Sequence, residues 1–197
     1  MAIAADAIND TPVLVTPRLE LSFGTAADAD VIFPYVHGEA GRAVTDTLIW
    51  DGPEAPTELT AFFELHRTGT FAANGFHWLV RDRDGSLTGT TGHAIGAIGM
   101  RSTDDPDMCD IGYWLIPPLW GRGLMAEAIA VVVERAFGHW GFEAVGADVF
   151  STNERSAALL LKLGFVRDGL MPDYNIKRGC PVDGVHYVLR RHPGNFS

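Results

Sequence analysis

The sequence predicts a mixed α/β fold, with antiparallel hairpins in the first half of the chain and a β-α-β unit at its centre. Three observations lead to this class. Short segments of alternating apolar residues fill the first half, the stretch from Gly123 to about Phe137 is apolar nearly all round, and strand-like segments flank that stretch. The 197 residues, 47% of them hydrophobic, fit one domain, which we expect at 13–192 after a flexible tail at 1–12.

The first half of the chain contains the expected hairpins and two helices. Leu19, Leu21 and Phe23 alternate in a first strand at 16–23. Thr25 is a suitable N-cap for a short helix that Pro34 should break. The other elements expected here are a helix within 51–69 with Leu59, Phe62, Phe63 and His66 on one stripe, a strand at 76–82, a long hairpin connection at 82–93, and strands at 94–101 and 109–116.

The second half begins where Pro117 and Pro118 end the preceding strand, because proline has no N–H to donate to a ladder. A buried helix follows from Gly123. We then expect a strand at 143–150 and a helix that starts in a capping box, with Ser151 answered by Glu154. Strands at 165–170 and 184–191 should close the sheet, with a loop within 167–184.

Composition and charge exclude several classes of protein. The formal net charge of −10 argues against a nucleic-acid partner and is compatible with a basic peptide or an amine. No apolar run approaches a membrane span, and the N-terminus lacks the features of a signal peptide. Cys109 and Cys180 are far apart and form no CxxC motif, which suits a cytoplasmic location. The seven histidines show no ligand spacing, so we expect no metal.

The turn before the central helix predicts an anion site. Gly121 and Gly123 flank Arg122 at the helix N-terminus, where free amides and the helix dipole favour negative charge. A tight turn without a ligand is the plainer alternative. The string GRGLMA also fits the dinucleotide fingerprint, but several strands precede it and no suitable ribose ligand follows. A Walker loop is excluded because no Gly-Lys-Ser/Thr is present.

The stretches DIGYWLIPPLWGRGLMAEAI and NERSAALLLKLGFVRDG, with TPRLEL at the start of the domain, resemble the Gcn5-related N-acetyltransferase (GNAT) family. They are most similar to its branch of ribosomal-protein N-terminal acetyltransferases. Gly121 and Gly123 match the glycines of the family's acetyl-CoA signature, whereas Pro118 stands at its Gln/Arg position. The resemblance implies a GNAT fold, in which a mixed, mainly antiparallel sheet has a splayed central strand pair that admits the pantetheine arm. The acetyl-CoA contacts it implies are Leu115, Ile116, Gly121, Arg122, Gly123, Leu124, Met125 and Asn153.

The same resemblance suggests roles in catalysis. Ser156 would protonate the departing thiolate or donate a hydrogen bond to it, and Asp110 would be the general base. Their structural alternatives are a small packing residue and a solvated carboxylate at the strand edge. Trp50 and Tyr113 are candidate acceptor-site residues, although both could simply fill the core or a loop. Cys109 is expected to be a buried strand residue, not an acyl carrier.

We therefore expect an acetyl-CoA-dependent N-acetyltransferase in which a primary amine attacks the thioester directly, without a metal. The resemblance favours a protein N-terminal amine as acceptor. A small amine such as an amino acid, polyamine or aminoglycoside is the alternative, and a catalytically silent acyl-CoA sensor is the non-enzymatic one. A homodimer is compatible with this interpretation.

Overall fold

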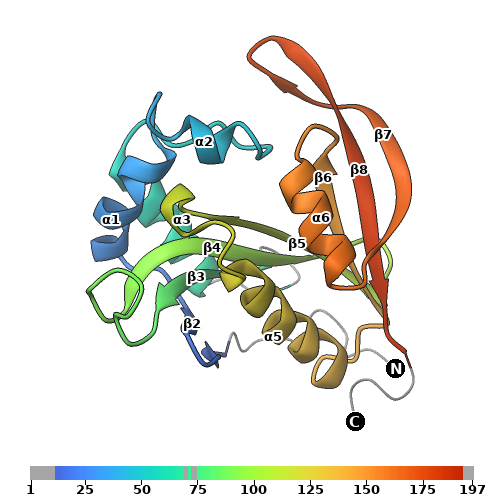
Figure 1. Cartoon of the computed structure of the whole chain (residues 1–197), viewed down its shortest axis with the longest axis horizontal. Coiled ribbons are helices and arrows are strands. Elements are labelled where there is room, and N and C mark those ends of the chain that lie inside the picture. The colour runs from blue at the N-terminus through green and yellow to red at the C-terminus, as the bar shows by residue number, and fades with distance from the viewer. Residues whose placement is uncertain (1–11, 69–70, 72–74, 193–197) are drawn as a thin grey trace.

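The computed structural model describes residues 12–68, 71 and 75–192, and in this part of the chain one eight-stranded sheet carries the fold (Figure 1). The strands are β1 (Leu14–Val15), β2 (Leu19–Ser22), β3 (Phe76–Asp82), β4 (His93–Ser102), β5 (Met108–Leu115), β6 (Ala144–Phe150), β7 (Val166–Lys177) and β8 (Cys180–Arg190). Their order across the sheet is β1-β2-β3-β4-β5-β6-β8-β7, and only β5 and β6 pair in parallel among these strands. This confirms the predicted mixed, mainly antiparallel sheet. Except for Pro12, the tail predicted at 1–12 lies outside the described residues.

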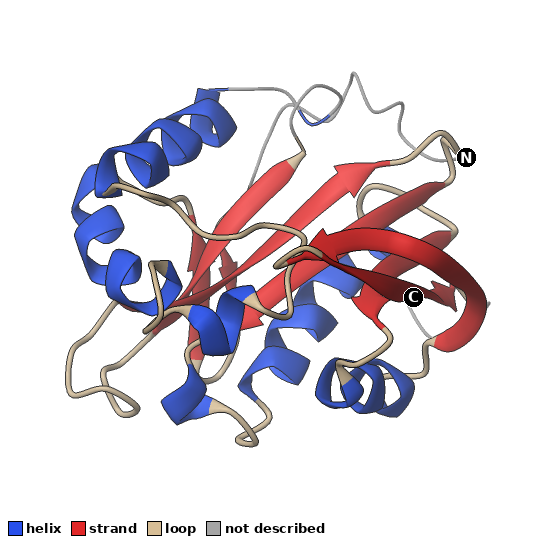
Figure 2. Cartoon of the chain, turned by 90° about the horizontal axis from the view of Figure 1, so that it is seen from above, coloured by secondary structure: helices blue, strands red, loops and turns tan. Residues whose placement is uncertain are grey.

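Helices lie on both sides of the sheet (Figure 2). They are α1 (Ala26–Val36), α2 (Arg42–Thr45), α3 (Pro56–Thr68), α5 (Leu124–Gly138) and α6 (Glu154–Lys162), with a 3₁₀ turn, η2, at Pro117–Leu119. Helices α1 and α3 pack together on one face of the sheet, and α5 packs on the other. No helix in the described ranges has the length and apolar character needed to cross a bilayer.

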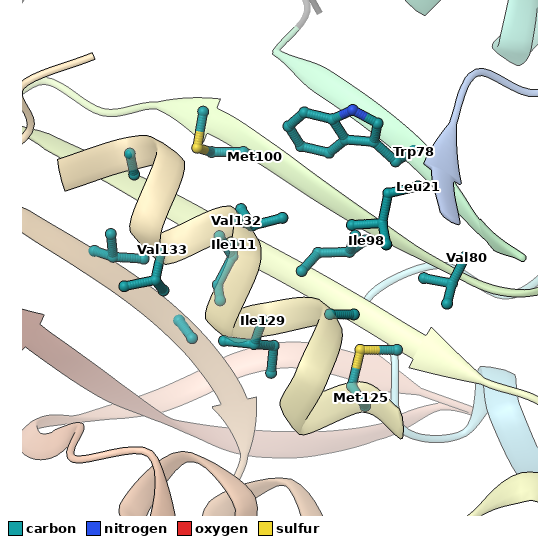
Figure 3. Packing of buried hydrophobic residues seen from close by; sticks show 14 of the residues in the cluster. Leu21, Trp78, Val80, Ile98, Met100, Ile111, Met125, Ile129, Val132 and Val133 are labelled. Carbon is teal, nitrogen blue, oxygen red and sulfur yellow. The ribbon is translucent and has the colours of Figure 1, made fainter. Parts of the chain in front are cut away.

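The core explains why β3 is apolar at successive positions. Trp78 and Val80 point toward α5, where they join Ile98 and Ile129, whereas Leu79 points to the opposite face and packs with α1 and α3 (Figure 3). A strand covered on both faces has no solvent side, so its apolar residues need not alternate with polar ones. Each such buried side chain contributes roughly 1.5–3 kcal/mol relative to its exposed state.

Two predicted helix ends are wrong. Helix α1 starts at the expected N-cap, Thr25, in a capping box with Asp28, but it continues through Pro34 to Val36. Pro34 lies in the last turn, so only one intrahelical hydrogen bond is lost there. Helix α6 is capped by Asn153, not by Ser151, since the Asn153 N–H bonds the Phe150 carbonyl in a tight turn that delays the helix.

The closing strands are also longer than the sequence predicts. Strands β7 and β8 form one hairpin that extends well beyond the rest of the sheet (Figure 1), and most of the loop expected at 167–184 belongs to it. Most residues of β7 are exposed or half-buried, so the strand shows no apolar alternation. Neither β1 nor α2 was predicted.

The central parallel pair separates soon after it begins. Register pairs join Met108 with Ala144, Cys109 with Val145 and Asp110 with Gly146, and no further pair follows among the described residues. The remaining parts of β5 and β6 diverge, which confirms the expected splayed strand pair. This opening is called the β5–β6 gap below.

Candidate active site

The turn before α5 has the geometry of an anion cradle. Gly121 and Gly123 adopt left-handed φ values of 75° and 74°, and α5 begins at Leu124. A Cβ at Gly121 would meet no described atom within 4 Å, and one at Gly123 would come only to 3.8 Å from Arg18 Nη2. The space above this turn is therefore open, and the first amides of α5 have no intrahelical acceptor. Both features suit an anionic ligand.

Arg18 and Glu127 fix this turn to the edge of the sheet. Arg18 Nε and Nη2 lie 2.7 and 2.6 Å from Glu127 Oε2, and Thr16 Oγ1 donates to Glu127 Oε1 at 2.5 Å. Burial would raise the pKa of Glu127, but the hydrogen bonds from Thr16 and Arg18 hold it below its usual range. Arg18 Nη1 also donates to the Arg122 carbonyl at 3.0 Å. Because a trans peptide directs its C=O and N–H oppositely, the Gly123 N–H points away from Arg18.

A cavity of about 620 Å³ lies on the α1/α3 side of the sheet and reaches the β5–β6 gap. Most of the lining is apolar or aromatic, and its polar side chains come mainly from α3, from strands β3 to β7 and from the start of α6. The residues predicted for the acceptor side and for catalysis all line it, namely Trp50, Asp110, Tyr113 and Ser156. Asn153, which was predicted to contact acetyl-CoA, also lines it.

Two hydroxyl groups meet at the end of this cavity. Tyr113 from β5 and Ser156 from the first turn of α6 place their oxygens 2.7 Å apart. Burial raises the pKa of Tyr113 to about 12, and Ser156 partly offsets this. Both groups therefore remain protonated at neutral pH, and either can donate a proton or a hydrogen bond. Asn153 Oδ1 caps α6 by accepting from the Ser156 N–H at 3.1 Å, and its amide NH₂ is a donor that a ligand could use.

Asp110 lies beside the gap, and only one of its two carboxylate oxygens has a hydrogen-bond partner among the described residues. Its Oδ2 accepts from Arg101 Nη2 at 3.1 Å, while Oδ1 is buried and has no hydrogen-bond partner in the described part of the chain. A Cβ on Gly146 would lie 2.2 Å from Oδ1, so this carboxylate requires a glycine opposite it on β6. An unpaired buried carboxylate oxygen is costly unless a ligand or water bonds it.

The sequence did not reveal a second carboxylate, Asp148 on β6. Its Oδ2 accepts from Arg101 at 3.3 Å and from the Tyr174 hydroxyl at 3.1 Å, and its Oδ1 lies 2.7 Å from His186 Nδ1. Burial and the nearby Asp148 raise the pKa of Tyr174 to about 12. An aspartate within the apolar strand AVGADVF was the available signal, because buried carboxylates are rare without partners.

The tip of the β7–β8 hairpin reaches the segment that carries Trp50. Lys177 Nζ donates to the Trp50 carbonyl at 2.9 Å and lies 2.5 Å from Asp51 Oδ1. Arg178 pairs with Asp46 in the same region. Trp50 itself is 38% exposed and lines the cavity. The hairpin and the 46–51 segment thus lie against each other at the acceptor side.

Three further residues predicted to contact acetyl-CoA, Leu115, Ile116 and Met125, differ in which backbone groups are available for hydrogen bonding. Both backbone groups of Ile116 are engaged, its N–H with Ile95 and its C=O with Leu119. Leu115 is the better pantetheine partner, although its carbonyl already accepts from the Trp120 indole at 2.6 Å. The Met125 side chain is buried in the core, so only its backbone could contact a ligand.

Cys109 is fully buried, as predicted, and burial raises the pKa of its thiol. Within the described ranges no three His, Cys, Asp or Glu side chains form a cluster that could hold a metal ion.

Several known proteins resemble this chain in sequence or in fold. Residues 18–166 match the family described as "Acetyltransferase (GNAT) domain". The uncharacterized N-acetyltransferase YoaA of Bacillus subtilis (strain 168) is 34% identical over 180 residues, which cover 90% of this chain and 96% of YoaA. The acetyltransferase MccE, solved with acetyl-CoA and AMP, has a TM-score of 0.76 at 17% identity, covering 92% of this chain and 98% of MccE. The ribosomal-protein-S5-alanine acetyltransferase of Vibrio fischeri has a TM-score of 0.70 at 19% identity, covering 91% and 97% of the two chains.

Proposed function

The chain belongs to the GNAT acetyltransferase family and is an acetyl-CoA-using N-acetyltransferase, and from this premise we propose that its acceptor is the N-terminal amine of a protein. One observation carries the site assignment. The β5–β6 gap leads from the glycine turn of α5 to a cavity that holds the Tyr113–Ser156 hydroxyl pair and Asp110.

In the proposed complex the amides around Gly121 and Gly123 hold the pyrophosphate, and the pantetheine arm pairs with the backbone of Leu115 in the gap. The amide NH₂ of Asn153 gives the arm a further hydrogen bond. The thioester then lies near the start of α6, next to Ser156. These contacts orient the acyl group before the amine arrives, which lowers the entropic part of the barrier.

Transfer requires one new bond and two proton movements. The neutral amine attacks the thioester carbonyl carbon, the C–N bond forms, and the C–S bond breaks as the thiolate leaves. Ser156, supported by Tyr113, donates a hydrogen bond or proton to the developing thiolate. The amine proton passes through a water molecule to Asp110 Oδ1, the carboxylate oxygen without a protein partner.

Asp110 suits the role of base better than Asp148. Both oxygens of Asp148 already have partners, whereas one oxygen of Asp110 has none among the described residues. Arg101 lies between the two carboxylates, with its Nη2 3.1 Å from Asp110 Oδ2 and 3.3 Å from Asp148 Oδ2. Its own pKa is raised by Asp110 and Asp148, in spite of partial burial.

Two observations support a protein N-terminus as acceptor. The fold resembles that of a ribosomal-protein-S5-alanine acetyltransferase, and the net charge of −10 attracts a basic polypeptide. The contacts between the hairpin tip and the 46–51 segment favour the second candidate, a small free amine, because they narrow the approach to the cavity.

The test is an acceptor screen that detects the free CoA thiol, with N-terminally unblocked peptides and small amines side by side. We expect turnover with peptides and none with the same peptides blocked at the N-terminus. Asp110→Asn, which keeps the side-chain shape, should lower kcat by about 10²–10⁴-fold if Asp110 is the base. Turnover of small amines alone would replace the protein acceptor with the second candidate.

A further inference from the structure

We propose that the acceptor carries an aromatic group with a polar edge, of the tyrosine or tryptophan type, next to its amine, and that this group lies in a trough on the cavity floor. The proposal rests on the proposed acetyl transfer at the β5–β6 gap and names the class of acceptor. The trough consists of Gly99 and Gly112, with His77 at its end.

Strand register places the trough between two rows of side chains. On the cavity face, residues of β3, β4 and β5 lie opposite one another in three rows. The rows are Leu79, Ala97 and Trp114; His77, Gly99 and Gly112; and Arg101 with Asp110, and all of these residues line the cavity. The middle row has no side chain between His77 and the gap. It leads directly from the expected acetyl group to His77.

The backbone does not require glycine at either floor position. Neither Gly99 nor Gly112 has a left-handed φ. A Cβ at Gly112 would meet no described atom within 4 Å, and one at Gly99 would make only contacts of 3.4 Å or more. Glycine inside a strand is less stable than alanine there, and it often marks close approach by a ligand. A ligand group that lies on the floor therefore explains why both residues are glycine, whereas the backbone conformation does not.

The far end of the trough is aromatic. The Phe62 ring meets His77 edge-on at 4.7 Å and lies 4.1 Å from His66, and His66 lies 5.6 Å from His77, measured between ring centroids. Phe62 and His66 come from α3 and also line the cavity. Aromatic walls of this kind favour an aromatic ring, which stacks or meets them edge-on. The trough spans two interstrand distances, about 10 Å, so it suits one side chain and not a long chain.

His77 supplies the polar selectivity. The edge that its ring turns to the floor carries Cδ2, which lies 3.5 Å from the Cβ position of Gly99, and Nε2 is bonded to that carbon. Nδ1 lies on the opposite edge, buried and without a hydrogen-bond partner among the described residues. Burial, with a smaller effect from His66, lowers the pKa of His77 to about 3, so the imidazole is neutral and can both donate and accept. A phenolic O–H or indole N–H at the edge of the bound ring donates to Nε2, the nitrogen on the trough side of the imidazole. Phenylalanine or leucine offers no such hydrogen bond, so peptides that begin with them should react more slowly.

The experiment compares peptides that differ only in their first residue (Tyr, Trp, Phe, Leu or Ala), together with tyramine as a free amine, by release of the CoA thiol. We expect kcat/KM to be at least tenfold higher for the Tyr or Trp peptide than for the Ala peptide. The Phe peptide should have an intermediate kcat/KM. His77→Phe should remove the advantage of Tyr over Phe. A wild-type enzyme that prefers Ala, or shows no preference, overturns the proposal while leaving acetylation of protein N-termini intact.

Floor variants provide an independent check. Gly112→Val should lower kcat/KM for the Tyr peptide at least tenfold more than for the Ala peptide, and Gly99→Ala should do so more weakly. Gly169→Val is the matched control, since Gly169 is a β7 residue outside the cavity whose Cβ would meet no described atom within 4 Å. Equal losses for both peptides in Gly112→Val would overturn the trough. If tyramine reacts and none of the peptides does, the proposed protein acceptor is wrong, and the proposed aromatic group on the acceptor is supported.

Discussion

Gly123→Ala separates the two reasons for a glycine at the start of α5. The new Cβ would lie no closer than 3.8 Å to any described atom, that atom being Arg18 Nη2, so the fold has room for it. The cost to the free protein is that of a left-handed non-glycine residue at φ 74°, roughly 1–2 kcal/mol. For a chain of this size each kcal/mol lowers Tm by about 2–4 °C, so we expect a fall of about 2–8 °C.

Acetyl-CoA binding should suffer more than stability does. The methyl group enters the space where the pyrophosphate is expected, and losing even one hydrogen bond to a charged phosphate costs about 1.5–3 kcal/mol, a weakening of about 10- to 100-fold in Kd. Calorimetric titration of acetyl-CoA into the folded variant measures this. Gly89→Ala is the matched control, because Gly89 has φ 86° and no described atom within 4 Å of its Cβ, in the turn between β3 and β4. It should lose similar thermal stability and bind acetyl-CoA normally. Unchanged affinity in Gly123→Ala would mean that the glycine serves only the turn.

Three further outcomes are expected. Ser156→Ala should lower kcat by about 10–10³-fold with little change in acetyl-CoA affinity, because its hydroxyl meets the sulfur only as charge develops, and full kcat would leave Tyr113 or water as the donor. Cys109→Ala should keep its turnover and sequential kinetics in initial-rate analysis, since the thiol is buried; parallel double-reciprocal lines would indicate an acyl-cysteine. The pKa of His77 is lower in the folded chain than in the unfolded one, so its contribution to stability is present above about pH 6.5 and is lost toward pH 3. Between pH 7 and 5 the wild type should lose about 2 kcal/mol more than His77→Phe in chemical denaturation, and equal losses would show that the pKa of His77 is not lowered in the folded chain.

Local patterns predicted the parts of the fold that local forces determine. The strand at 76–82 was found with its observed bounds, because its apolar residues and polar flanks are contiguous in sequence. The glycine turn and α5 were equally recognisable. The network of Asp110, Arg101 and Asp148 could not be predicted, since it depends on the register of three strands, and nothing local encodes that register.

Prediction of the acceptor side was weaker for a related reason. Trp50 and Tyr113 were identified as candidates, but no local pattern indicates that the 172–181 segment reaches the loop that carries Trp50. That contact joins polar and charged groups, which leave no hydrophobic periodicity in the sequence. The trough likewise depends on two glycines from different strands, and each of them alone is an ordinary strand glycine.

The attachment of the glycine turn to Arg18 and Glu127 also bears on how quickly acetyl-CoA can bind. Because Arg18 holds both the Arg122 carbonyl and the first turn of α5, the chain gives up the conformational freedom of this turn when it folds. Binding of acetyl-CoA then requires little further ordering of the turn, so the entropic cost of binding is small. Its association rate should therefore approach that of a rigid receptor and show no slow rearrangement phase.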